Sequence, residues 1–107
     1  MSFEVYKDNV GEYRFRLKAS NGQTVLSGEG YSEKTGVMNG IKSVRENSKI
    51  SERYDLYTDK AEKYRFRLKA ANGQIIGVSE AYESEANRAK GIDSVMHWAK
   101  ESTIKEV

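Results

Sequence analysis

The feature that most constrains this chain is an internal repeat that covers most of its 107 residues. Residues 3–48 align with residues 54–99 at a constant offset of 51 without a gap, and 18 of these 46 positions are identical. Two copies are too few for a solenoid, which needs about three units to bury its faces. A unit of about 50 residues also buries little surface alone. We therefore expect two units packed about a pseudo-twofold axis, as in a homodimer joined into one chain.

Within each copy the hydrophobic period changes once. Tyr13, Phe15 and Leu17 alternate with basic residues, which is typical of a half-buried strand. Asn-Gly follows at 21–22 and again at 72–73, a strong signal for a tight β-hairpin. Another strand is expected before each hairpin, at 3–7 and 54–58. A helix is expected after each hairpin, because residues spaced by three and four form one helix face. These residues are Met38, Ile41, Val44 and Ser48 in the first copy and Ala89, Ile92, Val95 and Ala99 in the second.

Two details predict how these elements join. Gly40 and Gly91 fall inside the helices, where Gly costs about 1 kcal/mol relative to Ala, so we expect a close approach of helix to sheet. The tails at 50–52 and 103–107 could each add one more strand. The junction at 49–53 is too short for independent domains. We predict an α+β fold over residues 1–107, one domain made of two repeats (about 1–51 and 52–107), with an antiparallel sheet and two helices on one face.

The repeated motifs resemble those of a known family. Tyr-Arg-Phe-Arg-Leu-Lys-Ala-x-Asn-Gly-Gln at 13–23 and 64–74, Glu-x-Tyr at 29–31 and 80–82, and Gly-Ile-x-Ser-Val at 40–44 and 91–95 resemble the YegP-like family of small bacterial proteins. The resemblance spans nearly the whole chain. It implies β-β-β-α-β units, in tandem or as two subunits, that share one sheet and exchange their C-terminal strands. It carries no established activity, cofactor or catalytic residue with it.

The composition excludes several classes of protein. The chain has no Cys, so disulfide scaffolds, thiol nucleophiles and thiolate zinc sites are excluded. A single His removes His-rich metal sites, and we expect neither a metal nor a cofactor. No apolar run approaches the ~20 residues of a membrane span, and the N-terminus lacks a signal-peptide pattern. We expect a soluble, cytoplasmic protein that is monomeric because its repeats pair internally.

The strongest candidate binding feature is a basic stripe. If Phe15 and Leu17 face the helices, the alternating cations face the other way, with Tyr6 and Tyr57 interleaved from the preceding strands. Such a sheet face could follow a phosphate backbone and stack bases. The possible polyanion-binding residues are Arg14, Arg16, Lys18, Arg65, Arg67 and Lys69.

A structural role for the stripe competes with that interpretation. Closing the first hairpin at Asn-Gly places Arg14 opposite Glu29, and the second hairpin places Arg65 opposite Glu80. The other four cations then have no carboxylate directly opposite. The net charge of only +2 is also far below that of dedicated nucleic-acid binders. We expect the stripe mainly to solubilise the sheet, with weak polyanion contact as the alternative.

Catalysis has little support in the sequence. His97 and Trp98 occur in one copy only, and a hydrolytic enzyme built around His97 is a remote alternative. His97 falls off the apolar helix face and should point to solvent, whereas Trp98 should cover the core. No paired carboxylates, Ser-His arrangement or phosphate-binding loop is recognisable. We therefore predict a non-enzymatic binding or interaction module with an unidentified ligand, which presents its open sheet face or its sheet edges to a partner.

Overall fold

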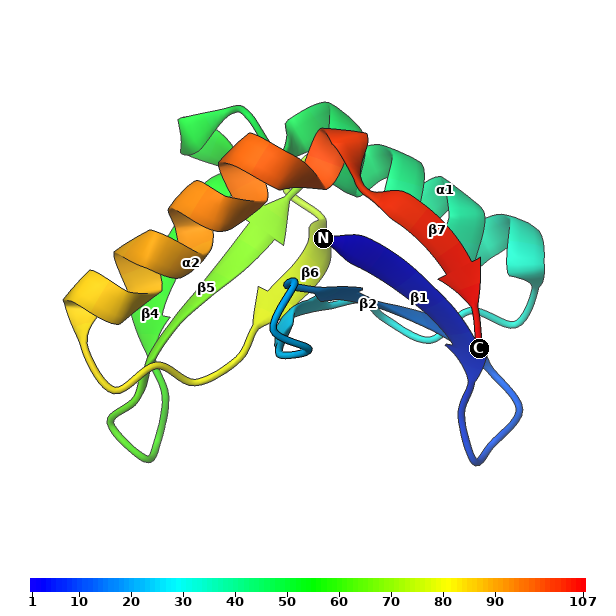
Figure 1. Ribbon diagram of the computed structural model, residues 1–107, viewed down its shortest axis with the longest axis horizontal. Helices are drawn as coiled ribbons and strands as arrows, with labels where there is room; N and C mark the ends of the chain where they lie inside the picture. Colours follow the sequence, from blue (N-terminus) through cyan, green and yellow to red (C-terminus); the bar gives the residue numbers. More distant parts are fainter.

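Each repeat contributes three consecutive strands and a helix, in the computed structural model that describes residues 1–107 (Figure 1). The first repeat forms β1 (Ser2–Lys7), β2 (Tyr13–Lys18), β3 (Thr24–Ser27) and α1 (Lys34–Asn47). The second forms β4 (Tyr54–Thr58), β5 (Tyr64–Lys69), β6 (Ile75–Ser79) and α2 (Glu85–Trp98). Short 3₁₀ turns follow the helices, η1 (Ser51–Arg53) and η2 (Ala99–Glu101), and the chain ends with β7 (Thr103–Glu106).

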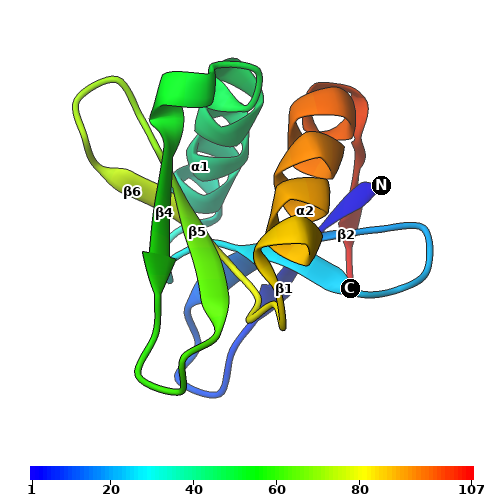
Figure 2. The same cartoon turned by 90° about the vertical axis from the view of Figure 1, so that its left-hand side faces the viewer.

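All seven strands join in one sheet, in the order β4-β5-β6-β3-β2-β1-β7, with both helices on the same side (Figures 1 and 2). The repeats meet where β3 pairs with β6, through Leu26 opposite Ser79 and Ser27 opposite Val78. The predicted α+β fold with two tandem repeats is thus confirmed. The sheet is mixed rather than wholly antiparallel, because β7 runs parallel to β1.

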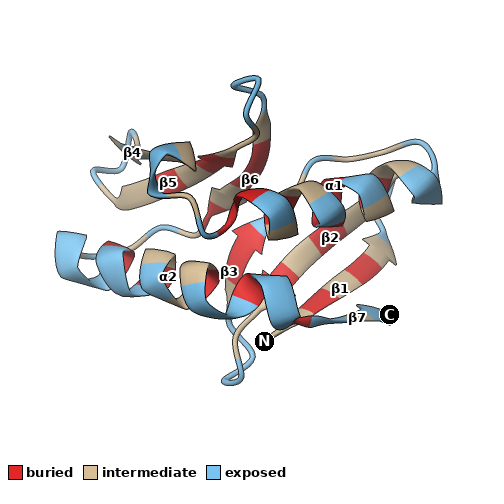
Figure 3. Ribbon diagram, turned by 90° about the horizontal axis from the view of Figure 1, so that it is seen from above, coloured by how far each residue is buried: buried red, intermediate tan, exposed pale blue.

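The two predicted tail strands have different outcomes. The second tail forms β7, which crosses back to the first repeat and lies beside β1 (Figure 3). The prediction of a strand at 50–52 is wrong, since this segment turns through η1 and leads directly into β4. Residues 52–55 stand at the repeat positions of 103–106. Because they form the end of η1 and the start of β4, they cannot form a separate strand like β7. The exchange of C-terminal strands therefore runs in one direction only.

The core lies between the helices and the sheet (Figure 3). Alternate residues of β1, β2 and β5 are fully or almost fully buried, as the period of two predicts. The predicted helix face is correct at Ile41, Val44 and Val95. It is shifted at its start, where Val37 and Arg88 are buried while Ala89 is exposed. The buried set comprises Phe3, Val5, Phe15, Leu17, Val25, Leu26, Val37, Ile41, Val44, Phe66, Leu68, Ile76, Val95 and Ala99.

The two helix glycines mark the predicted close approach, and the neighbour in each case is a tyrosine hydroxyl. A Cβ atom placed on Gly40 would lie 2.7 Å from Oη and 3.2 Å from Cζ of Tyr31. The same arrangement, tighter still, joins Gly91 to Tyr82. Each tyrosine is fixed by a short antiparallel bridge, Tyr31 to Tyr13 and Tyr82 to Tyr64. The glycines are therefore required by packing, despite their cost to helix stability.

This packing predicts a double-mutant cycle. Gly40→Ala should destabilise the protein by about 1 kcal/mol or more, because overpacking costs about 1–3 kcal/mol and exceeds the gain in helix propensity. In a Tyr31→Phe background the same change should be neutral or stabilising, because the hydroxyl that Cβ would strike is gone. Urea denaturation of the four proteins measures both differences. An equal penalty in the two backgrounds would exclude the hydroxyl as the cause.

Candidate binding surfaces

The six residues of the predicted stripe lie on the sheet face opposite the helices. They alternate along β2 and β5 with the buried Phe15, Leu17, Phe66 and Leu68. Their side chains are between 30% and 38% exposed. The structure therefore brings two rows of three cations onto one open face, as the alternation predicts: Arg14, Arg16 and Lys18 on β2, and Arg65, Arg67 and Lys69 on β5.

In the first repeat, one carboxylate on β1 serves two of these cations. Glu4 lies opposite Arg16 in the β1–β2 ladder and accepts a hydrogen bond from its Nε at 2.8 Å. Lys18 Nζ lies 3.8 Å from the same Glu4 oxygen. The Arg16 hydrogen bond lowers the pKa of Glu4, and the charges of Lys18 and of Lys105 on β7 lower it further.

The second repeat has the same arrangement around Asp55 on β4. Asp55 lies opposite Arg67, with Nη1 of Arg67 3.2 Å and Nζ of Lys69 3.8 Å from its Oδ2. The prediction that no carboxylate lies directly opposite is therefore wrong for Arg16 and Arg67, whereas Lys18 and Lys69 contact the same carboxylates diagonally. It follows the hairpins to β3 and β6 alone, whereas β2 and β5 each have a second neighbouring strand.

The two remaining cations pair with turn residues rather than with Glu29 and Glu80, so that prediction is also wrong. Nε of Arg14 donates to Asp8 Oδ2 at 2.7 Å, which is the main cause that lowers the pKa of Asp8. Nε of Arg65 lies 3.0 Å from Asp59 Oδ2 without hydrogen-bond alignment. Neither predicted partner belongs to a strand, because β3 ends at Ser27, before Glu29, and β6 ends at Ser79, before Glu80. All six cations of the stripe thus lie within 4 Å of a carboxylate, although Glu4 and Asp55 are each shared by two cations.

Aromatic rings complete this face. The guanidinium carbon of Arg16 lies 4.3 Å from the centre of the Tyr6 ring, and that of Arg67 lies 3.6 Å from the centre of Tyr57. The interleaving of tyrosines with cations is therefore correct. A hollow of about 510 Å³ lies where the repeats meet, lined among others by Tyr6, Arg16 and Arg65. Arg16 and Arg67 are thus already stacked on rings and paired with carboxylates, which makes them less available to a phosphate chain.

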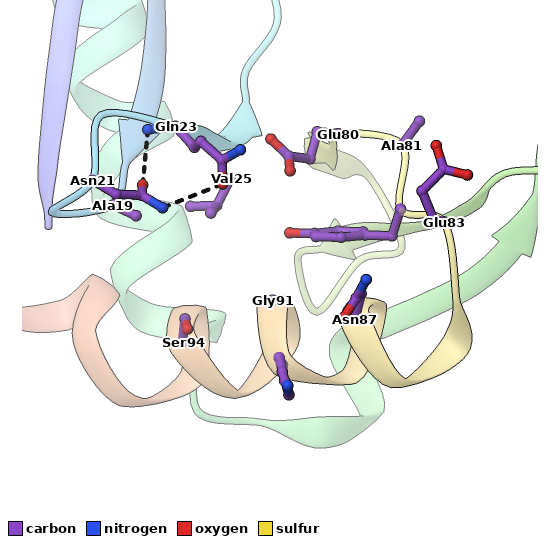
Figure 4. A pocket seen from close by; sticks show the side chains of 12 residues that line it. Ala19, Asn21, Gln23, Val25, Glu80, Ala81, Glu83, Asn87, Gly91 and Ser94 are labelled. Carbon is purple, nitrogen blue, oxygen red and sulfur yellow. Dashed lines mark hydrogen bonds between the residues drawn. The ribbon is translucent and has the colours of Figure 1, made fainter.

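A second hollow, of about 530 Å³, lies on the helix side between the β2–β3 hairpin and α2 (Figure 4). Asn21 and Gln23 face it from the first repeat, while Glu80, Asn87 and Ser94 face it from the second. Burial raises the pKa of Tyr82, which also lines the hollow, to about 12. Asn21 Oδ1 already accepts from the Gln23 amide, and Tyr82 packs on Gly91. Asn21 and Tyr82 thus have structural roles at this hollow.

The third surface is the edge strand β4. Sequence reasoning names sheet edges as candidate surfaces without identifying this one. Leu56 on β4 stands at the repeat position of Val5 on β1, and both belong to the helix-facing alternation of their strands. Val5 is 3% exposed because β7 lies beside β1, whereas Leu56 is 53% exposed because β4 has no outer neighbour. The repeat itself indicates the uncovered edge. Residues 52–55 stand at the positions of β7, but they begin β4 and so cannot also form an added edge strand.

Side chains from elsewhere hold β4 in place without such a neighbour. Tyr54 Oη donates to the Ser48 carbonyl at 2.6 Å and fixes the start of the strand. Nη1 of the buried Arg88 donates to the carbonyls of Tyr57 at 3.2 Å and Arg65 at 3.5 Å, so α2 fastens β4 to β5. β4 is therefore an ordered strand whose outer edge is uncovered.

The residues unique to one copy form no catalytic group. His97 is exposed, as predicted. Trp98 is 50% exposed with its ring against His97, so the prediction that it covers the core is wrong. No group of three or more His, Cys, Asp and Glu side chains lies close enough to hold a metal ion. Neither helix is long and apolar enough to cross a membrane.

Comparisons with known proteins agree with the repeat and the fold. The family described as "Domain of unknown function (DUF1508)" matches residues 8–55 and again 59–106, the same offset of 51. A UPF0339 protein in the ptx operon 5′ region of Stutzerimonas stutzeri is 48% identical over 106 residues, which is 99% of this chain and 96% of that protein. UPF0339 protein YegP of Escherichia coli K12 is 45% identical over 104 residues, 97% of this chain and 94% of its own.

Two solved structures share the architecture. The solution NMR structure of UPF0339 protein SO3888 from Shewanella oneidensis has a TM-score of 0.91 at 48% identity, covering 98% of this chain and 89% of that one. The solution NMR structure of yegP from E. coli, described as a protein of unknown function, has a TM-score of 0.91 at 45% identity, covering 98% and 90%. These names describe no enzymatic activity. The chain belongs to the DUF1508 family, as one of its YegP-like members with two tandem repeats.

Proposed function

We propose that this protein is a non-enzymatic interaction module that binds an extended polypeptide segment along the outer edge of β4. The observation that carries the proposal is the contrast between Val5, 3% exposed beside β7, and Leu56, 53% exposed at the equivalent position of β4. Addition of a strand to a sheet edge is a common mode of peptide recognition. The first repeat contains its own example of such an addition, since β7 comes from the far end of the chain.

The backbone of β4 is suited to this role. On β1, the Val5 carbonyl points away from β2 and accepts a hydrogen bond from the Val107 amide at 3.0 Å. The equivalent carbonyl of Leu56 points outward from β4 in the same way, since the β4–β5 register repeats that of β1–β2. Natural edge strands are commonly protected by Lys, Pro or a bulge. β4 has none of these and carries a single charge, Asp55, whereas the opposite edge, β7, carries Lys105 and Glu106.

The remaining expectations fit this role. The seam between β3 and β6 joins the repeats as a dimer interface would, which supports action as a monomer. The helices do not span a membrane, and the absence of Cys is compatible with the cytoplasm. We propose that the protein acts as a monomer in the cytoplasm.

Weak polyanion binding through Arg14, Arg16, Lys18, Arg65, Arg67 and Lys69 is the alternative, favoured only by the hollow that Arg16 and Arg65 line. Because these cations are paired, we expect single-stranded DNA to bind no more tightly than about millimolar at low salt. If binding is tighter, changing Arg16 and Arg67 together to Gln should reduce the slope of log affinity against log salt by about two. A titration at two salt concentrations decides: salt-sensitive micromolar binding that this variant weakens would establish the alternative.

The edge proposal predicts the effect of one proline. Leu56→Pro removes an outward-pointing amide and should leave the β4–β5 ladder intact, because proline is tolerated at edge positions that face solvent. Random peptides displayed on phage are selected on the wild-type protein and re-tested on the variant. We expect the enriched peptides to lose binding at least tenfold.

Leu56→Val is the matched control, because it keeps the amide and introduces the residue that β1 carries at this position. It should retain binding, and circular dichroism should show that both variants are folded. Enriched peptides that bind the proline variant as well as the wild type, or a selection that yields none, would contradict the proposal.

A further inference from the structure

Strand β7 is the strand added to β1, which is the edge of the first repeat that corresponds to β4. It runs parallel to β1, with Thr103 opposite Ser2, Ile104 opposite Phe3, Lys105 opposite Glu4 and Glu106 opposite Val5. The offset of 51 transfers this register to the second repeat, where the three last positions are Tyr54, Asp55 and Leu56. A comparison of the two edges then indicates which side chains a partner strand of β4 should carry at each position. This step rests on the function proposed above.

The position opposite Tyr54 calls for an apolar residue. On the first edge, Ile104 lies beside Phe3 and packs against the buried core. Tyr54 also packs on the core, with its ring 5.6 Å from that of Phe66. A β-branched apolar side chain opposite Tyr54 would cover the same kind of surface that Ile104 covers on Phe3.

The position opposite Asp55 calls for a cation. Glu4 is surrounded by Arg16, Lys18 and the charge of Lys105, which the added strand β7 supplies, and its side chain is 17% exposed. Asp55 has the first two cations, Arg67 and Lys69, but no third, and its side chain is 42% exposed. A Lys or Arg on the partner strand would occupy the place that Lys105 has beside Glu4.

The next position, opposite Leu56, also calls for a cation, and here the two edges differ in sign. On the first edge Glu106 pairs with Lys34 at the start of α1. Glu85 occupies the position of Lys34 at the start of α2, and its side chain is 75% exposed although its Oε1 lies 3.8 Å from Nη2 of Arg88. An acidic residue that suits the β1 edge would therefore be repelled at the β4 edge, whereas a basic one would be attracted.

We infer that the partner of β4 is an extended basic segment that runs parallel to β4, with a β-branched apolar residue opposite Tyr54 followed by two cations opposite Asp55 and Leu56. The charge at the second cation position also gives selectivity. A segment with Lys there is repelled by Lys34 on the first edge and attracted by Glu85 on the second. It therefore does not compete with β7 for β1.

Two end-capped synthetic peptides test this inference against the uniformly ¹⁵N-labelled full chain. One is Ser-Thr-Ile-Lys-Glu-Val, the sequence of residues 102–107, and the other is Ser-Thr-Ile-Lys-Lys-Val, which differs in one charge. We expect the basic peptide to shift the amide signals of β4 and to bind about threefold more tightly or better, the size usual for one exposed charge pair. Glu85→Lys should reverse the preference, and Asp55→Asn should weaken both peptides.

A spin label on the peptide N-terminus reports orientation. Parallel addition should broaden the signals near Tyr54, and antiparallel addition those near Thr58. Three outcomes would overturn the inference while leaving the edge itself as a binding site. They are preference for the acidic peptide, antiparallel addition, and β4 shifts that depend on protein concentration without peptide, which would indicate a second copy at the edge. Shifts on β1 caused by displacement of β7 would overturn it as well. No shift on β4 with either peptide, when displayed peptides still bind there, would overturn only the basic parallel segment. If displayed peptides also fail, the proposed function falls.

Discussion

One topological constraint governs the asymmetry of this molecule: a single chain has two equivalent sheet edges but only one C-terminal strand to cover them. β7 leaves the second repeat and pairs with β1, so the first edge is complete. In the first repeat the residues at the corresponding positions, 52–55, are taken up by η1 and the start of β4. The edge of β4 therefore stays uncovered, and Leu56 is exposed where Val5 is buried. The second repeat compensates locally, since Arg88 on α2 holds the carbonyls of both β4 and β5.

The same repeat shows which features of the sequence are structural. The Glu-x-Tyr and mid-helix Gly motifs belong together, because each tyrosine hydroxyl fills the space where a Cβ of Gly40 or Gly91 would lie. Every cation of the basic stripe contacts a carboxylate, with Glu4 and Asp55 on β1 and β4 each serving an Arg and a Lys. These contacts explain why both copies keep these residues without any need for a shared ligand.

Much of the fold could be predicted from the sequence because it depends on local periodicity. The alternation around Phe15, the Asn-Gly hairpins and the spacing of Ile41 and Val44 each predict an element that the structure contains. The partners of the cations could not be predicted from one hairpin, since β2 and β5 have neighbours on both sides and β3 ends before Glu29. Which edge stays uncovered depends on the strand with which β7 pairs. That pairing depends on the topology of the whole chain and not on the sequence of any one segment.

Amide hydrogen exchange of the free protein tests the central claim, the asymmetry of the two edges, most directly. The Val5 amide lies in the ladder between β2 and β7, and the Leu56 amide occupies the same position on β4. We expect the Leu56 amide to exchange at least about a hundredfold faster than the Val5 amide, because a strand neighbour protects only the latter. The amides of Leu17 and Leu68, which are buried and lie opposite Leu26 and Gly77 in the inner ladders of the two repeats, should be similarly protected and serve as the control. Equal protection of Val5 and Leu56 would contradict the account, because it would mean that the two edges are alike.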